Sequence, residues 1–146
     1  MKQLVIVILG LLISSCLKGQ DKQDIVINKL SNINHWEIEF VKGKTDTVGV
    51  KNWLPSTELT IKFQNKKDSN CLKPNFDFYP VELVTYIEKK LRNHLMLRST
   101  LYPPTPNIYK TDNFIILGWN LTDYDGRTCC ECTNLKSELT KILGFK

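Results

Sequence analysis

The sequence has no uninterrupted apolar stretch of about 18 residues, so it offers no ordinary membrane-spanning helix. It also contains no G-x-S-x-G, H-E-x-x-H or P-loop motif, which are the familiar patterns of serine hydrolases, zinc peptidases and nucleotide-binding proteins. Only two histidines are present, His35 and His94, and neither belongs to a recognisable catalytic or metal-binding pattern. These absences favour a non-catalytic protein with no cofactor and no bound metal.

Arginine is also scarce. Of the 20 cationic residues only three are arginines, namely Arg92, Arg98 and Arg127, and the overall charge is +5. Arginine is the residue that recognises phosphates and bases in a bidentate manner, whereas dispersed lysines mainly confer solubility. The composition therefore predicts that nucleic acid is not a partner.

The clearest pattern lies at the N-terminus. Lys2 precedes Leu4 to Ile13, an apolar stretch of ten residues, which has the length of the hydrophobic region of a signal peptide. The next residues are Ser14, Ser15 and Cys16. The sequence from Leu12 to Cys16 resembles the lipobox of bacterial lipoproteins, in which an aliphatic residue stands three positions before the cysteine and small residues lie between.

The resemblance implies a signal peptide over residues 1–15, cleavage after Ser15 and acylation of Cys16. The partner of the acylated Cys16 is then the lipid bilayer, because two or three acyl chains hold a protein firmly at about 0.8 kcal/mol per buried methylene. Residues 16–24 would form the lipidated cysteine and a polar, flexible tether, and residues 25–146 a single globular domain. The implied location is the bacterial cell envelope, outside the cytoplasm.

The remaining sequence predicts an α+β fold. Hydrophobic residues make up 42% of the chain and charged residues 24%, which suits one ordinary folded domain. Alternation at Trp36, Ile38 and Phe40 predicts a strand, and the unbroken apolar run over 114–119 predicts a central strand that is covered on both faces. The expected elements are a short helix over 24–33, an antiparallel three-strand meander over 36–41, 46–52 and 59–63, a long helix over 80–95, the strand over 114–119, and a C-terminal helix over 129–143.

A proline-rich segment over residues 98–113 has no clear periodicity. Long segments of this kind are often functional, so we predict that Tyr102 and Tyr109, which flank the prolines, contact a protein partner. The alternative is a passive connector that packs on the sheet.

Four cysteines remain once Cys16 is lipidated. An even number in an exported chain favours disulfides. Thr128 and Glu131 have the spacing of a capping box, which would start the last helix at Cys129. In such a helix Cys129 and Cys132 are separated by about 5 Å between Cα atoms, a distance that a disulfide bridges, whereas Cys129–Cys130 and Cys130–Cys132 are unfavourable. The predicted bridges are Cys129–Cys132 and Cys71–Cys130.

Two other hypotheses remain open for these cysteines. Cys129 and Cys132 form a C-x-x-C motif near a helix start, which is compatible with thiol-redox chemistry. Together with Cys71 or His94 the thiolates could also bind zinc or cuprous ion. The function predicted from the sequence is a membrane-anchored envelope lipoprotein that binds another protein without catalysis, as an inhibitor or immunity-type factor does. The alternative is a thiol-redox or metal-handling protein that acts through Cys129 and Cys132.

Overall fold

The computed structural model describes residues 22–43, 54–97, 106–121 and 128–146; of residues 95–97 it describes the backbone only. Its contacts divide the chain into two compact units, residues 1–32 and 33–146, which are described separately. In the first unit, residues 22–30 form a helix. Within the described residues this helix already includes residues 22 and 23, ahead of the expected start at 24, and it ends three residues before the expected end.

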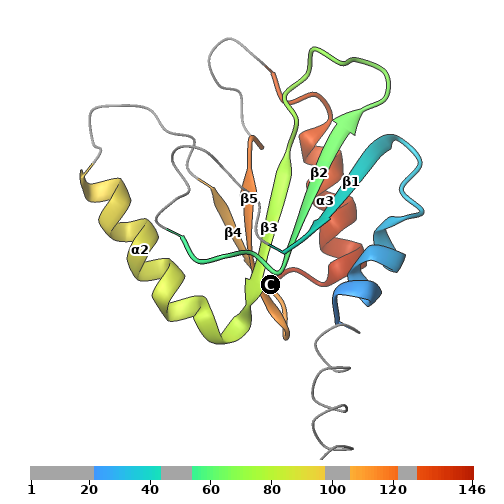
Figure 1. The fold of residues 1–146 in the computed structure, drawn as a ribbon. Helices are drawn as coiled ribbons and strands as arrows, with labels where there is room; N and C mark the ends of the chain where they lie inside the picture. Colours follow the sequence, from blue (N-terminus) through green and yellow to red (C-terminus); the bar gives the residue numbers. More distant parts are fainter. Residues whose placement is uncertain (1–21, 44–53, 98–105, 122–127) are drawn as a thin grey trace, which may run out of the picture. The chain divides into compact units, whose positions relative to one another are not determined.

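The second unit is built on a five-stranded antiparallel sheet (Figure 1). Its strands stand in the order β1-β2-β3-β5-β4, so that β3 is central and β1 and β4 lie at the edges of the described sheet. The strands are β1 (Trp36–Lys42), β2 (Leu59–Asn65), β3 (Asn75–Pro80), β4 (Asn107–Lys110) and β5 (Phe114–Trp119). A 3-10 turn (Val81–Leu83) leads into helix α2 (Val84–Leu97), and helix α3 (Cys132–Leu143) follows β5.

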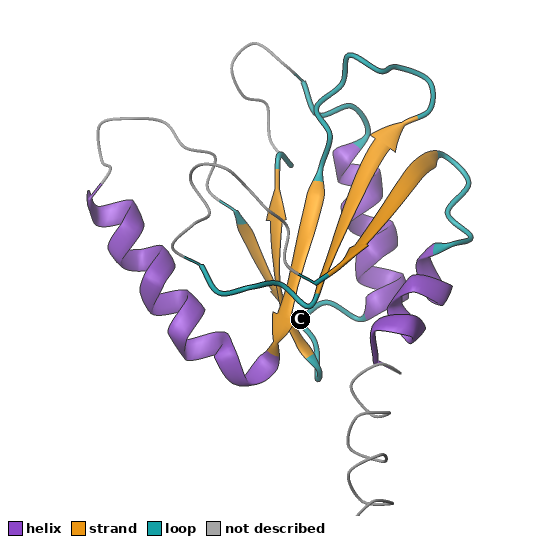
Figure 2. Ribbon diagram, viewed as in Figure 1, coloured by secondary structure: helices purple, strands orange, loops and turns teal. Residues whose placement is uncertain are grey.

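Helices α2 and α3 lie on opposite faces of the sheet (Figure 2). Because side chains alternate along a strand, β3 sends Tyr79 to one face and Phe76 to the other. On the Tyr79 side, a buried cluster joins Tyr79 to Ile87 and Leu91 of α2 and to Leu117 of β5. All six residues of β5 are buried, so the predicted cover on both faces is confirmed, although β5 lies between β3 and the edge strand β4 rather than at the centre of the sheet.

The three-strand meander was predicted incorrectly. Strand β1 pairs directly with β2, with Ile38 opposite Phe63, so no third strand stands between these two in the described sheet. Residues 46–52 themselves fall outside the described residues. The neighbour of β2 on its other side is β3, a strand that was not expected from the sequence.

Strand β3 was overlooked because Asp77 interrupts its apolar residues. The carboxylate of Asp77 is buried, with 1% of the residue exposed. It accepts hydrogen bonds from the hydroxyl of Thr60 and the indole N–H of Trp119, both at 2.8 Å. A buried charge is tolerated when it is hydrogen-bonded in this way. Burial, and then the nearby Asp77 charge, raise the pKa of Tyr79 well above its usual range.

Two further expectations are corrected at the C-terminal side. Residues 107–110 of the segment expected to lack structure form β4. Helix α3 begins at Cys132 rather than Cys129, and its N-cap residue Glu131 has a left-handed backbone (φ 61°) without a capping hydrogen bond from its side chain. The expected capping box is therefore absent. The predicted end of the helix is confirmed, because Gly144 adopts the left-handed conformation (φ 68°) that commonly terminates helices.

No helix within the described ranges is long and apolar enough to cross a membrane.

Candidate functional site

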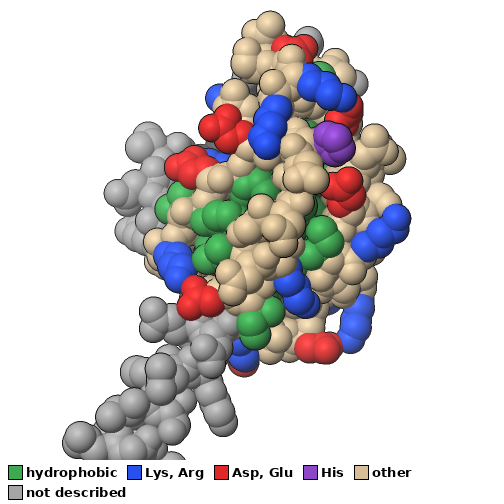
Figure 3. Space-filling view, turned by 90° about the vertical axis from the view of Figure 1, so that its right-hand side faces the viewer, with side chains coloured by type: hydrophobic (Ala, Val, Ile, Leu, Met, Phe, Trp, Pro, Cys, Tyr) green, Lys and Arg blue, Asp and Glu red, His purple; other side chains and the backbone are tan. Residues whose placement is uncertain are grey.

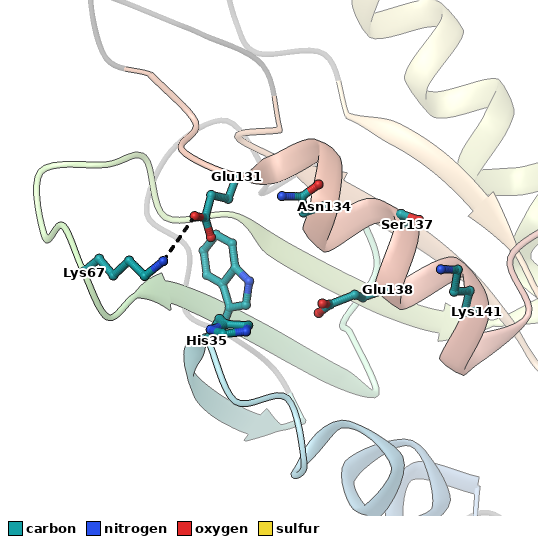
Figure 4. A pocket seen from close by; sticks show the side chains of 8 residues that line it. His35, Lys67, Glu131, Asn134, Ser137, Glu138 and Lys141 are labelled. Atoms are coloured by element: carbon teal, nitrogen blue, oxygen red, sulfur yellow. Dashed lines mark ion pairs between the residues drawn. The ribbon is translucent and has the colours of Figure 1, made fainter.

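A polar groove of about 350 Å³ lies between α3, the start of β1 and the segment after β2 (Figure 4). Trp36 is the first residue of β1 and His35 directly precedes it, one residue comes from the segment after β2, and five come from α3 and its N-cap. The lining residues are His35, Trp36, Lys67, Glu131, Asn134, Ser137, Glu138 and Lys141. Segments that are far apart in the sequence therefore build one surface.

The spacing along α3 explains why its polar residues share this groove. Asn134, Glu138 and Lys141 follow one another at intervals of four and three residues, which places them on one face of a helix. A different face carries Leu135 and Leu139, which are 0% and 1% exposed. Burial of this apolar face fixes the rotation of the helix and so presents the polar residues to the groove.

Disulfide bonding fixes the beginning of α3 beside the segment that follows β2. Cys71 and Cys130 form a disulfide with their Cα atoms 5.6 Å apart, and the backbone N–H of Leu72 donates to the carbonyl of Thr128 at 3.0 Å. The Cα atoms of Cys129 and Cys132 lie 5.5 Å apart, a separation that a disulfide can bridge. The predicted Cys71–Cys130 bridge is thus confirmed, although the helix begins later than expected, and the Cys129–Cys132 bridge stays a prediction.

Charges of both signs line the groove. The ammonium of Lys67 lies 3.7 Å from the carboxylate of Glu131, and Figure 4 shows these two side chains pointing toward each other at one end. Glu138 and Lys141 have no ion pair or hydrogen bond of their side chains within the described part of the chain. Trp36, only 3% exposed, gives the groove an apolar wall and packs edge-on against Phe63.

Acidic and basic side chains are also intermingled on the molecular face drawn in Figure 3, around hydrophobic side chains near its centre. Among the described residues drawn there, no large area of a single charge sign is visible. Such a mixed surface differs from the continuous basic patch that is typical of nucleic-acid binding.

A second, larger cavity of about 590 Å³ lies over β1, β2 and the beginning of β3. Its polar side chains follow the strand alternation, and Glu39 of β1 forms an ion pair of 3.0 Å with Lys62, its partner across the ladder in β2. Ion pairs across neighbouring strands are common on exposed sheet surfaces. This cavity is therefore explained by the open polar face of the sheet.

Of the two tyrosines predicted to contact a partner, Tyr102 lies outside the described residues. Tyr109 belongs to β4, where its ring stacks on Phe145 at 4.5 Å between centroids. Burial raises the pKa of the Tyr109 hydroxyl, and this oxygen has no hydrogen-bond partner among the residues that the structure describes. Tyr109 is thus part of a packed aromatic cluster, while its predicted role in partner binding stays a prediction.

Cys16 also lies outside the described residues. Among the described ones, the structure brings together a single group of possible metal ligands, Asp68 with Cys71 and Cys130. Since Cys71 and Cys130 are bridged, they offer no thiolate to a metal.

The groove could not be recognised from the sequence. The polar face of α3 has the same pattern as the solvent-exposed face of any amphipathic helix, so it carried no functional signal. Lys67 and His35 are remote from α3 in the sequence, and only tertiary structure brings them there.

Comparisons with protein-family models, with curated proteins and with solved structures found no match to this chain.

Proposed function

We propose that this protein is a lipid-anchored, non-catalytic binding module of the bacterial cell envelope, which recognises another protein as an inhibitor or immunity-type factor does. The observation that carries the proposal is the polar groove, whose lining combines hydrogen-bonding groups, charges of both signs and an apolar wall from Trp36. Specific contact surfaces share this combination of polar rim and buried aromatic residue.

Preorganisation supports the same proposal. The groove residue Glu131 directly follows Cys130, whose disulfide to Cys71 ties the start of α3 to the segment after β2. Holding a contact surface in place before binding lowers the entropy that association costs. A groove fastened in this way suits recognition of a partner by a rigid surface.

The anchor rests on the lipobox resemblance at Cys16. Acyl chains at that residue would confine the domain to a membrane surface, where even a weak binding surface meets a membrane-bound partner at a raised local concentration. Anchoring and binding are therefore parts of one proposal.

The test is capture of the partner from native envelopes by the full chain, with crosslinking before detergent extraction. Asn134→Arg places a long cation in the groove, and Asn93→Arg makes the same change at an exposed position of α2. We expect a protein that the wild type and Asn93→Arg capture equally and that Asn134→Arg loses by at least tenfold. Equal capture by all three proteins, or capture of nothing beyond the background of an untagged strain, would contradict the proposal.

One observation favours a second candidate, a thiol-redox or metal-handling role of Cys129 and Cys132. Cys129 is half-buried whereas Cys132 is 4% exposed, so one sulfur of the pair is more accessible than the other. Such asymmetry is common where an outer cysteine exchanges with a partner thiol. Counting free thiols and analysing bound metal in freshly isolated protein distinguishes the candidates, because the binding module has neither.

A further inference from the structure

Two opposite charges in the groove are available to a ligand. The carboxylate of Glu138 and the ammonium of Lys141 both line it, and neither forms an ion pair with any described residue. Figure 4 shows Glu138 projecting from α3 toward the side of the groove on which His35 lies. By contrast, the charges of Lys67 and Glu131 at the other end already face each other at 3.7 Å.

We propose that the groove binds an extended segment of the partner protein that carries one basic and one acidic side chain two residues apart. Glu138 would pair with the basic side chain and Lys141 with the acidic one. This inference rests on the proposed binding function and specifies the chemistry that the groove recognises.

The spacing of the two charges supports this choice. Residues three apart on a helix have their Cβ atoms about 5–6 Å apart. In an extended chain, residues two apart point to the same side and are separated by about 6.5 Å. An extended segment therefore presents two side chains at nearly the separation at which α3 presents Glu138 and Lys141.

The net charge of the groove argues against a ligand of one sign. Glu131 and Glu138 balance Lys67 and Lys141, so neither a simple anion nor a simple cation gains from a net field. A ligand with both charges satisfies both free groups at once. The groove volume of about 350 Å³ lies within the range of sites that hold small ligands or a few side chains.

The test uses capped peptides and the full chain in detergent micelles. The main probe is acetyl-Gly-Lys-Ser-Glu-Gly-amide, and three companions replace its lysine, its glutamate or both by glutamine. A fifth peptide, acetyl-Gly-Lys-Glu-Ser-Gly-amide, has the same composition with the charges on neighbouring residues, where they point to opposite sides. Binding is followed by NMR shifts of the Trp36 indole and of the backbone amides of 131–141.

We expect each matched charge to raise the affinity about two- to fivefold, which is the range for exposed ion pairs. Glu138→Gln should remove the advantage of the lysine in the probe, and Lys141→Gln the advantage of the glutamate. The double exchange of Glu138→Lys with Lys141→Glu retains the net charge and should still prefer the main probe, bound in the opposite direction. Lys136→Gln on the same helix, outside the groove lining, serves as the control and should change nothing.

Equal affinity for the charged and neutral peptides overturns this inference, as does equal affinity for the two arrangements of the same composition. Absence of shifts in the groove with every peptide overturns it as well. If Asn134→Arg nevertheless abolishes capture of a partner, the binding function stands and only its charge pattern is wrong. If the peptides discriminate but no partner is captured, the groove chemistry is right and the envelope function is wrong.

Discussion

Loss of the Cys71–Cys130 disulfide should destabilise the protein far more than loss of the Cys129–Cys132 bridge. The former joins residues 59 positions apart, so the chain-entropy model gives a stabilisation of about 4 kcal/mol. The latter joins residues only 3 positions apart, for which the same model gives about 2 kcal/mol. The difference arises in the unfolded chain, where the longer loop loses more conformational freedom.

The comparison uses two double variants of the full chain, Cys71→Ser with Cys130→Ser and Cys129→Ser with Cys132→Ser. Urea unfolding is followed by tryptophan fluorescence, and non-reducing peptide mapping verifies that the remaining pair is oxidised. We expect the first variant to lose about 4 kcal/mol, and its Tm to fall by about 15 °C for a domain of this size. An equal or smaller loss than in the second variant would refute the loop argument and would show that local structure at the start of α3 matters more than chain entropy.

Three other changes test separate parts of the molecule. Cys16→Ala should abolish acyl labelling and leave precursor or soluble protein; acyl label that persists in a detergent-phase assay would contradict the lipobox prediction. Tyr109→Ala should lower the free energy of unfolding in urea by about 2 kcal/mol, because the tyrosine ring stacks on Phe145 at 4.5 Å between centroids. Tyr109→Phe should change this free energy by less than about 0.5 kcal/mol, because the hydroxyl has no hydrogen-bond partner in the described structure. An equal loss in both variants would speak against the stacking argument. Gly118→Ala should lower the same free energy of unfolding by about 1–3 kcal/mol, since the new Cβ would lie 2.7 Å from Cδ1 of Leu121. An unchanged stability would contradict this and would mean that the Leu121 side chain moves aside freely.

Two results illustrate how sequence reasoning succeeded and failed here. The cysteine pairing was derived from a helix that begins at Cys129, and this premise is wrong because α3 begins at Cys132. The Cys71–Cys130 bridge nevertheless agrees with the structure, and Cys129 and Cys132 lie close together because residues three apart are near each other in any compact turn. The meander failed for a different reason, namely that the alternation of a strand identifies its faces but not its neighbour.

The sequence by itself determined the features that depend on local hydrophobic periodicity and on residues that end a helix. These are the alternating strand from Trp36, the fully buried strand over 114–119, the amphipathic last helix and its end at Gly144. Only the tertiary structure decided what depends on contacts between remote residues. It buried Asp77 by supplying hydrogen bonds from Thr60 and Trp119, and so allowed a charged residue in the central strand. It also brought His35 and Lys67 to α3, because a groove is formed by packing between elements, and no local pattern records which elements pack together.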